Sequence, residues 1–294
     1  MKIEDFLNYL RYERNRSELT VCSYGRSLEE FESYFKNKDS QLSWESVDSD
    51  VIRDWMESLM DKGDMASTVN NRLSAVRSFF RFALSRGLVA NDPAHNVRVP
   101  KKKKPLPQFV REGDMDRLID MPEMWSDSYK DVRARTIILL FYTTGVRLAE
   151  LIGLDDQDVD FVNRQLKVTG KRNKQRIVPF GEELEQALRA YMSQRDEQPV
   201  KLDAALFLND KGCRMTRSQV GQIVKAGLSR VTTMKKRSPH VLRHSFATAM
   251  LNNGAGLESV RKLLGHESVA TTEIYTHTTF EQLKRVYKDA HPRA

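Results

Sequence analysis

The chain has 294 residues, of which 40% are hydrophobic and 30% are charged, a balance typical of a soluble globular protein with a real core. Its length favours two domains of ordinary size. The formal net charge of +8 suits a polyanionic partner such as nucleic acid, because each phosphate that a protein neutralises releases condensed counterions. Charge alone is equally compatible with a protein that is merely basic.

Several classes of protein are disfavoured by simple patterns. Cys22 and Cys213 lie far apart and form no C-x-x-C motif, which favours a reducing compartment. The first residues have the pattern of an amphipathic helix and lack the apolar core of a signal peptide. The longest apolar run, residues 137–142, is too short to span a bilayer. We therefore expect a soluble, cytoplasmic protein without a membrane partner.

Residues 1–98 are predicted to form a helical domain. Apolar residues recur at i, i+3, i+4 and i+7 from Ile3 to Leu10, the pattern of a helix with one buried face. Ser67 is a candidate N-cap for the fourth helix, and Gly87 is its stop signal. The further predicted helices cover about 20–38, about 48–60 and 67–86. Four helices with short loops predict a compact bundle.

A basic linker is predicted at residues 99–107. Four consecutive lysines lie between prolines, a sequence that cannot continue a helix and would not pack in a core. These are Lys101, Lys102, Lys103 and Lys104. Two interpretations remain open: a solvated linker, or a linker laid across a DNA backbone with the lysines contacting phosphates.

Residues 108–294 predict a mixed but mostly helical second domain. Residues 160–169 and 175–179 are expected to form a small antiparallel sheet with a turn at 170–174. Ala205–Leu208 is a candidate for a further short strand. The predicted helices cover 112–120, 130–143, 147–153, 182–194, 216–228, 240–252, 257–264 and about 279–290.

Tyr275 is the candidate nucleophile of this second domain. The phenol of tyrosine has an ordinary pKa near 10, so it needs a base or a positive neighbourhood to attack a phosphodiester at neutral pH. Arg147 and Arg243 could clamp the phosphate, because the arginine fork holds two oxygens and stays charged. His240 and His266 could hydrogen-bond the same oxygens.

Lys171, in the turn between the two strands, could give a proton to the departing 5′ oxygen. Each of these residues alone also has an ordinary structural explanation. Arg147 could pair with Glu150 three residues on, His240 could neighbour a helix cap, and His266 follows a candidate C-cap glycine. Their joint occurrence in this order favours catalysis.

Five stretches carry a resemblance to a known family. They are T-G-V-R-L-A-E-L, V-T-G-K-R-N-K-Q-R-I-V-P, S-P-H-V-L-R-H-S-F-A-T, L-L-G-H-E-S-V-A-T-T-E-I-Y-T-H and V-Y-K-D-A-H-P-R-A. Over essentially its whole length, the chain resembles a tyrosine site-specific recombinase, most closely the bacterial Xer type. The resemblance implies a SAM-like, core-binding N-terminal domain and a catalytic C-terminal domain that close around duplex DNA.

The resemblance also implies the catalytic residues, which are Arg147, Lys171, His240, Arg243, His266 and the nucleophile Tyr275. Arg172 stands where the family usually has glycine, so Arg172 and Lys174 compete slightly for the role of Lys171; both are also possible contacts to the DNA backbone. His244 lies one turn from His240 and is expected to support the site or to serve a structural role.

The activity that the resemblance implies is cutting and rejoining of DNA through a 3′-phosphotyrosine and a Holliday junction, without metal, ATP or another cofactor. Four protomers would act on two DNA sites, as a homo- or hetero-tetramer, with a sister recombinase or a cell-division DNA translocase as possible partners. The C-terminal helix would dock in a neighbouring subunit; folding back on its own domain is the alternative.

The biological task is open at this stage. Chromosome-dimer resolution is favoured, with a mobile-element integrase or DNA invertase of the same family as the alternative. We expect no additional arm-binding domain, which favours a simple recombinase.

Three other classes compete with a recombinase. They are a metal-dependent hydrolase, a DNA-binding protein without catalysis and a type IB topoisomerase. Asp155, Asp156, Asp158 and Asp160 could hold magnesium in a nuclease, although capping of a helix before a strand is the favoured interpretation. His240 and His244 have zinc-helix spacing, but Val241 replaces the glutamate of H-E-x-x-H. A DNA-binding protein without catalysis would not need the arginines, histidines and tyrosine together. A type IB topoisomerase uses similar chemistry but fits the whole chain less well.

Overall fold

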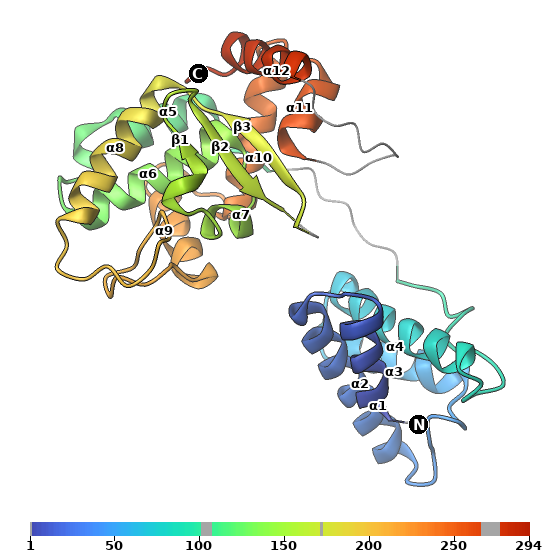
Figure 1. Ribbon diagram of the computed structural model, residues 1–294. Coiled ribbons are helices and arrows are strands. Elements are labelled where there is room, and N and C mark those ends of the chain that lie inside the picture. The colour runs from blue at the N-terminus through green and yellow to red at the C-terminus, as the bar shows by residue number, and fades with distance from the viewer. Residues whose placement is uncertain (1, 101–107, 171–172, 266–276) are drawn as a thin grey trace. The chain divides into compact units, whose positions relative to one another are not determined.

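The computed structural model describes residues 2–100, 108–170, 173–265 and 277–294. The chain divides into two compact units, residues 1–105 and 106–294 (Figure 1). The predicted linker at 99–107 lies largely outside the described residues. Within the described ranges, we find no helix with the length and apolar character to cross a membrane.

The N-terminal unit is a bundle of helices, as predicted (Figure 1). Its first helix, α1, continues directly into a turn of π-helix, η1. Phe6, Phe31 and Phe79 are fully buried at its centre. The bounds are α1 Ile3–Asn8, η1 Tyr9–Glu13, α2 Glu18–Lys38, α3 Ser49–Asp61 and α4 Ala66–Ser85.

The predicted N-cap of the fourth helix is wrong. Helix α4 begins at Ala66, its N-cap is Met65, and no side chain caps it. Ser67 therefore lies inside the first turn. Capping by a polar side chain does occur at α3, where the Asp48 carboxylate accepts hydrogen bonds from the backbone N–H groups of Asp50 and Val51, both at 2.9 Å.

Helix α6 is the centre of the C-terminal unit. It contacts α8, α9 and α10, and its apolar run from Ile137 to Tyr142 is almost completely buried. A core helix surrounded by others needs apolar residues on every side, which explains this run. The helices of this unit up to α9 are α5 Glu112–Asp120, η2 Pro122–Met124, α6 Tyr129–Thr144, α7 Leu148–Ile152, η3 Asp156–Asp158, α8 Glu182–Asp196 and α9 Arg217–Ser229.

The small sheet has three antiparallel strands in the order β1-β2-β3, in place of the two predicted. They are β1 Val159–Asp160, β2 Gln165–Thr169 and β3 Gln175–Pro179. The predicted first strand, 160–169, is broken by a tight turn. The Asp160 carboxylate accepts hydrogen bonds from the backbone N–H of Asn163 at 3.0 Å and from its side-chain amide at 2.7 Å. Arg164 has a φ of 51°, which reverses the chain.

The expected strand at Ala205–Leu208 is also wrong. Ala205 and Leu208 form only isolated bridges, with Asp155 and Arg214 respectively. The carbonyls of Ala205 and Leu206 accept hydrogen bonds from the Arg195 guanidinium, at 3.4 and 2.9 Å. A side chain thus occupies acceptors that a neighbouring strand would otherwise use.

The last three helices form a subdomain core of their own. They are α10 Pro239–Asn252, α11 Leu257–Leu264 and α12 His277–Ala290. Leu283 and Tyr287 of α12 pack with Phe246 and Met250 of α10. In this single chain α12 therefore lies on its own domain (Figure 1). Its exchange between subunits stays a prediction.

The residues after α12 are held in place by contacts with earlier helices. Arg293 forms ion pairs with Asp116 and Asp120 of α5 and with Glu183 of α8, at 2.8, 2.5 and 2.7 Å. His291 is buried against the ring of Tyr142. The last residues thus connect α12 to elements that lie much earlier in the sequence.

Candidate active site

Arg147 stands at the start of α7, immediately after the end of α6. Gly145 ends α6 with a φ of 60°, a conformation that favours glycine. A Cβ atom there would lie 2.5 Å from the Phe246 ring and 2.8 Å from a Leu264 methyl, so the backbone passes close to α10 and α11. This tight passage brings Arg147 beside both helices.

The Arg147 guanidinium makes two contacts and remains partly exposed. Its Nη1 donates to Glu150 Oε1 and its Nη2 to the Gly265 carbonyl, both at 2.8 Å. The pairing with Glu150 that we considered as a purely structural explanation is therefore present. The Arg147 side chain is nevertheless 38% exposed, so a ligand can still reach it.

Arg243, on α10, reaches the same end of α11. Its Nη1 donates to the Gly145 carbonyl at 2.5 Å and its Nη2 to the Leu264 carbonyl at 2.6 Å. Burial and the nearby charges of Arg147 and Arg176 lower the pKa of Arg243 to about 10. It stays protonated at neutral pH. Two of the predicted catalytic arginines therefore converge at the C-terminal end of α11.

A buried carboxylate lies behind these two arginines. Glu150 accepts two hydrogen bonds from Arg176, at 2.6 and 2.9 Å, and its side chain is 1% exposed. Burial opposes ionisation of Glu150, but the hydrogen bonds and charges of Arg176 and Arg147 outweigh burial and lower its pKa to about 2. Glu150 is therefore a permanent negative charge in the site.

Arg176 was not among the predicted site residues. One signal was available, because side chains alternate along a strand and Arg176 shares a face with the buried Val178. An arginine on the inner face of a small sheet requires a buried partner.

His240 and His244 lie on successive turns of α10, and both are exposed. His240 follows Pro239 at the start of the helix, three residues before Arg243. Burial, followed by the charges of His240 and Arg243, lowers the pKa of His244. His240 and Arg243 thus lie about one turn apart on the same helix, and their catalytic roles stay a prediction.

The remaining predicted site residues lie outside the described residues. They are Lys171, His266 and Tyr275, together with Arg172 and Lys101–Lys104 among the possible DNA contacts. Lys174 is described, and its carbonyl accepts a hydrogen bond from the Gly170 N–H at 2.7 Å.

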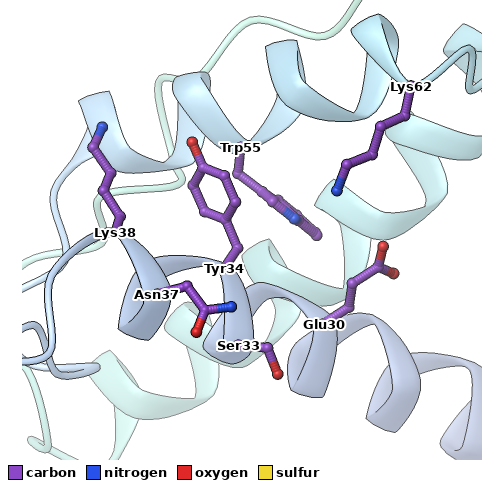
Figure 2. A pocket seen from close by; sticks show the side chains of 7 residues that line it. All are labelled: Glu30, Ser33, Tyr34, Asn37, Lys38, Trp55 and Lys62. Atoms are coloured by element: carbon purple, nitrogen blue, oxygen red, sulfur yellow. The ribbon is translucent and has the colours of Figure 1, made fainter.

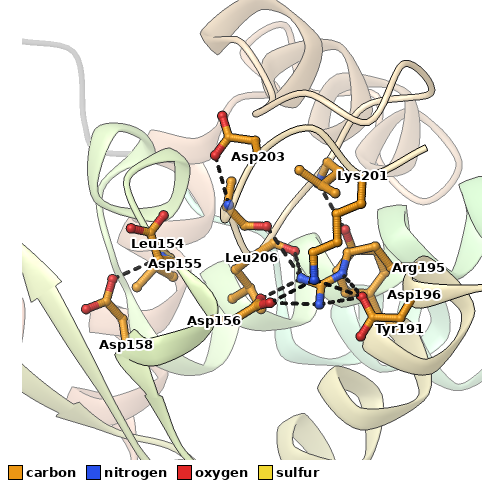
Figure 3. Close-up of polar contacts among 12 residues, drawn as sticks. Leu154, Asp155, Asp156, Asp158, Tyr191, Arg195, Asp196, Lys201, Asp203 and Leu206 are labelled. Atoms are coloured by element: carbon orange, nitrogen blue, oxygen red, sulfur yellow. Dashed lines mark hydrogen bonds and ion pairs between the residues drawn. The ribbon is translucent and has the colours of Figure 1, made fainter. Parts of the chain in front are cut away.

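Asp155, Asp156 and Asp158, three of the four aspartates of residues 155–160, make structural contacts (Figure 3). Asp156 accepts two hydrogen bonds from the buried Arg195, at 2.6 and 2.9 Å, and one from Lys201 at 3.1 Å. Asp155 pairs with Arg214 at 2.6 Å. The carboxylates of Asp155 and Asp156 are thus neutralised by arginines, contacts that the capping interpretation did not include.

Asp158 accepts from the Asp155 N–H at 3.0 Å, which fixes the short helix η3 before β1. Among the described residues, no three or more acidic, histidine or cysteine side chains gather as a metal site.

A surface hollow of about 530 Å³ lies in the N-terminal unit, over the edge of Trp55 (Figure 2). Lys38, at one side, is paired with Asp54. The hollow contains none of the predicted catalytic residues, so it offers no alternative active site. Its lining consists of Glu30, Ser33, Tyr34, Asn37, Lys38, Trp55 and Lys62.

Comparison with known proteins places this arrangement in a family. Residues 108–282 match the phage integrase family, and residues 3–87 match the N-terminal SAM-like domain of phage integrases. Tyrosine recombinase XerD of Oceanobacillus iheyensis is 36% identical and aligns over 99% of this chain and 98% of the relative. Tyrosine recombinase XerC of Chlorobaculum parvum is 37% identical, over 99% and 94%.

Solved structures show the same fold. The crystal structure of XerA recombinase is 28% identical, with a TM-score of 0.50 and coverage of 99% of this chain and 98% of that chain. XerH bound to its difH substrate is 23% identical, with a TM-score of 0.70 over 97% and 84%. The chain belongs to the phage integrase family and is a tyrosine recombinase.

Proposed function

We propose that the protein cuts and rejoins duplex DNA at specific sites through a covalent 3′-phosphotyrosine, with Tyr275 as the nucleophile. The observation that carries this proposal is the convergence of Arg147 and Arg243. Their guanidinium groups, one from the N-cap of α7 and one from α10, bind successive carbonyls at the end of α11. Two forks so close together suit the oxygens of one phosphate.

The reaction follows from the residues assigned to it. The phenolic oxygen of Tyr275 attacks the scissile phosphorus while the bond to the 5′ oxygen breaks. Arg147 and Arg243 stabilise the added negative charge of the five-coordinate transition state. His240 and His266 hydrogen-bond the phosphate, and one of them accepts the proton that the phenol loses. Lys171 gives a proton to the leaving 5′ oxygen. The products are a 3′-phosphotyrosine and a free 5′-hydroxyl.

Rejoining reverses the same step with a different strand. The phosphotyrosine ester conserves the energy of the phosphodiester, so a 5′-hydroxyl of a partner duplex reseals the bond without ATP or metal. Two such rounds, through a Holliday junction, recombine two sites. Four protomers on two DNA sites would carry them out, and exchange of α12 between neighbours would couple their activities.

The favoured biological task is resolution of chromosome dimers, which would link the protein to chromosome partition, cell division and the cell cycle. Support comes from curated relatives named XerC and XerD that align with nearly the whole chain. A sister recombinase and a cell-division DNA translocase would be its partners in the cytoplasm. Integration of a mobile element or DNA inversion is the alternative within the same family.

The nucleophile is tested with Tyr275→Phe on a nicked duplex that traps the covalent adduct. The DNA site is first recovered by mapping adducts of the wild-type protein on the genome. Tyr275→Phe should abolish the adduct and leave DNA binding intact. The control Tyr12→Phe alters a tyrosine that is 73% exposed in the N-terminal unit and should leave the adduct unchanged. A persistent adduct in Tyr275→Phe would reject the assignment.

The same mapping tests the biological task. Adducts concentrated at one chromosomal position would favour dimer resolution, and adducts at the ends of mobile elements would favour integration. Cleavage should also persist in EDTA. A strong loss of cleavage in EDTA would instead support metal-dependent hydrolysis.

A further inference from the structure

Three arginines from three different elements hold the C-terminal end of α11. Arg176 of β3 donates from Nε to the Leu263 carbonyl at 3.1 Å. The next two carbonyls along the chain accept from Arg243 and Arg147, at 2.6 and 2.8 Å. The last carbonyls of a helix lack partners within the helix and carry its partial negative charge. The arginines supply both the missing donors and the opposite charge.

Arg176 differs from the other two arginines by its second contact. Its two Nη atoms hold both oxygens of Glu150, at 2.6 and 2.9 Å, and the two side chains are 9% and 1% exposed. Glu150 also accepts from Arg147 Nη1 at 2.8 Å. One buried carboxylate is thus shared by an inner arginine and by an outer arginine that a phosphate can reach.

The packing around Arg176 leaves it no freedom to turn toward DNA. A Cβ atom on Gly265 would lie 3.0 Å from Arg176 Cδ and 3.1 Å from its Nε, so the end of α11 lies directly on this side chain. All three of its guanidinium nitrogens already donate to protein oxygens. Arg147, by contrast, is 38% exposed. Arg176 therefore supports the site without touching a phosphate.

We propose that Arg176 is a positioning residue for strand cleavage. By holding Glu150 and the end of α11 together, it keeps Arg147 and Arg243 at the spacing and orientation that one phosphate requires. This inference rests on the proposed function, because it assumes that Arg147 and Arg243 bind the scissile phosphate. Arg243 is also buried, at 7% exposed, but unlike Arg176 it donates to backbone carbonyls and, among the described residues, not to a carboxylate.

Charge explains why the position of Arg147 depends on Arg176. The carboxylate of Glu150 is neutralised mainly by the two-pronged contact with Arg176. Without that partner, a buried negative charge would have only Arg147 as its counter-ion, and burial strongly favours such pairing. Arg147 would then be drawn inward and its charge would no longer be available to a phosphate. Removing the charge of Glu150 in the same chain should reverse part of this effect.

The experiment measures single-turnover formation of the covalent adduct on the nicked duplex, with DNA affinity and thermal unfolding measured beside it. Arg176→Gln should slow adduct formation about 100-fold, because a displacement of about 1 Å in a site costs about that much. Arg176→Lys should recover part of the rate, since an ammonium group can still hold Glu150. The matched control is Arg214→Gln, which removes an arginine with similar contacts to Asp155 and to carbonyls at the other end of α7.

The double variant Arg176→Gln, Glu150→Gln separates positioning from general loss of structure. Positioning predicts faster cleavage in the double variant than in Arg176→Gln alone, whereas a purely structural role predicts a further loss. Equal rates for Arg176→Gln and Arg214→Gln, or no recovery in the double variant, would overturn this inference alone. Absence of a Tyr275 adduct in the wild-type protein would overturn the proposed function and this inference with it.

Discussion

Gly145→Ala should destabilise the C-terminal unit and disturb the site that it leads into. Gly145 has a φ of 60°, and its added Cβ would lie 2.5 Å from Phe246 and 2.8 Å from Leu264. Backbone strain for a non-glycine residue in this region costs about 1–2 kcal/mol. Forcing a methyl group into a packed core costs about 1–3 kcal/mol more. We therefore expect a loss of about 2–5 kcal/mol in the free energy of unfolding.

The chain offers a control that separates the two contributions. Gly254, in the same unit, has a φ of 87°, and a Cβ there would have no atom within 4 Å. Gly254→Ala should therefore cost only the strain, about 1–2 kcal/mol. The difference between the two variants in the free energy of unfolding measures the steric clash of a side chain at residue 145 with α10 and α11.

Hydrogen–deuterium exchange in increasing urea is the suitable assay, because peptides from α6 and α10 report on the C-terminal unit alone. A fluorescence transition of the whole chain would mix two units and would not be two-state. Gly145→Ala should also slow DNA cleavage, since the Gly145 carbonyl accepts from Arg243. Equal destabilisation by the two variants would refute the argument from packing.

Two further predictions concern Arg243 and the chain end. Arg243→Lys should reduce the rate of single-turnover cleavage by about 100-fold with little change in DNA affinity. The reason is that one ammonium group cannot reach both carbonyls and a phosphate. The control is Arg189→Lys, which changes an arginine at an exposed position. Acid should loosen the chain end, because burial lowers the pKa of His291 to about 4 and its Nδ1 accepts from the Arg293 N–H. Unfolded His291 binds its proton near pH 6.5, so this stability is complete above pH 6.5 and falls by about 3 kcal/mol as the pH drops to 4. Proteolysis after α12 should therefore be faster at pH 5 than at pH 7.5, and His291→Phe should abolish that difference.

The helices could be predicted from the sequence because their signals are local. The fully apolar run of α6 and the regular spacing in α2 and α11 specify burial within a few turns. Their observed bounds lie within about two residues of the predicted ones. The bounds of the strands were harder to predict. The turn at Asp160–Arg164 depends on the Asp160 carboxylate, which accepts a hydrogen bond from the Asn163 N–H. An apolar and polar alternation does not reveal such a turn.

Arg147 and Arg243 could be selected as candidate catalytic residues because few arrangements need so many cationic residues near one tyrosine. Arg176 was missed because its partners come from other elements: Glu150 from α7 and Leu263 from α11. Likewise, the role of Arg195 depends on Asp156 and on the carbonyl of Leu206. Contacts of this kind join residues far apart in sequence, so residue spacing can place Arg176 on the inner face of its strand but cannot identify its partners.

The contacts that hold the last residues in place have a consequence for assembly of the protein. If α12 exchanges between protomers, as proposed above, Arg293 and His291 would make on an identical neighbour the contacts that they make within this chain, so the two arrangements would differ little in contact energy. The balance then depends on effective concentration. A tethered helix meets its own docking surface at a concentration on the order of millimolar. In a free protomer, α12 would therefore dock on its own domain. Alignment of protomers on one DNA would raise the local concentration of the neighbour's docking surface enough to compete with it. Binding of several protomers to one DNA would then trigger the proposed exchange.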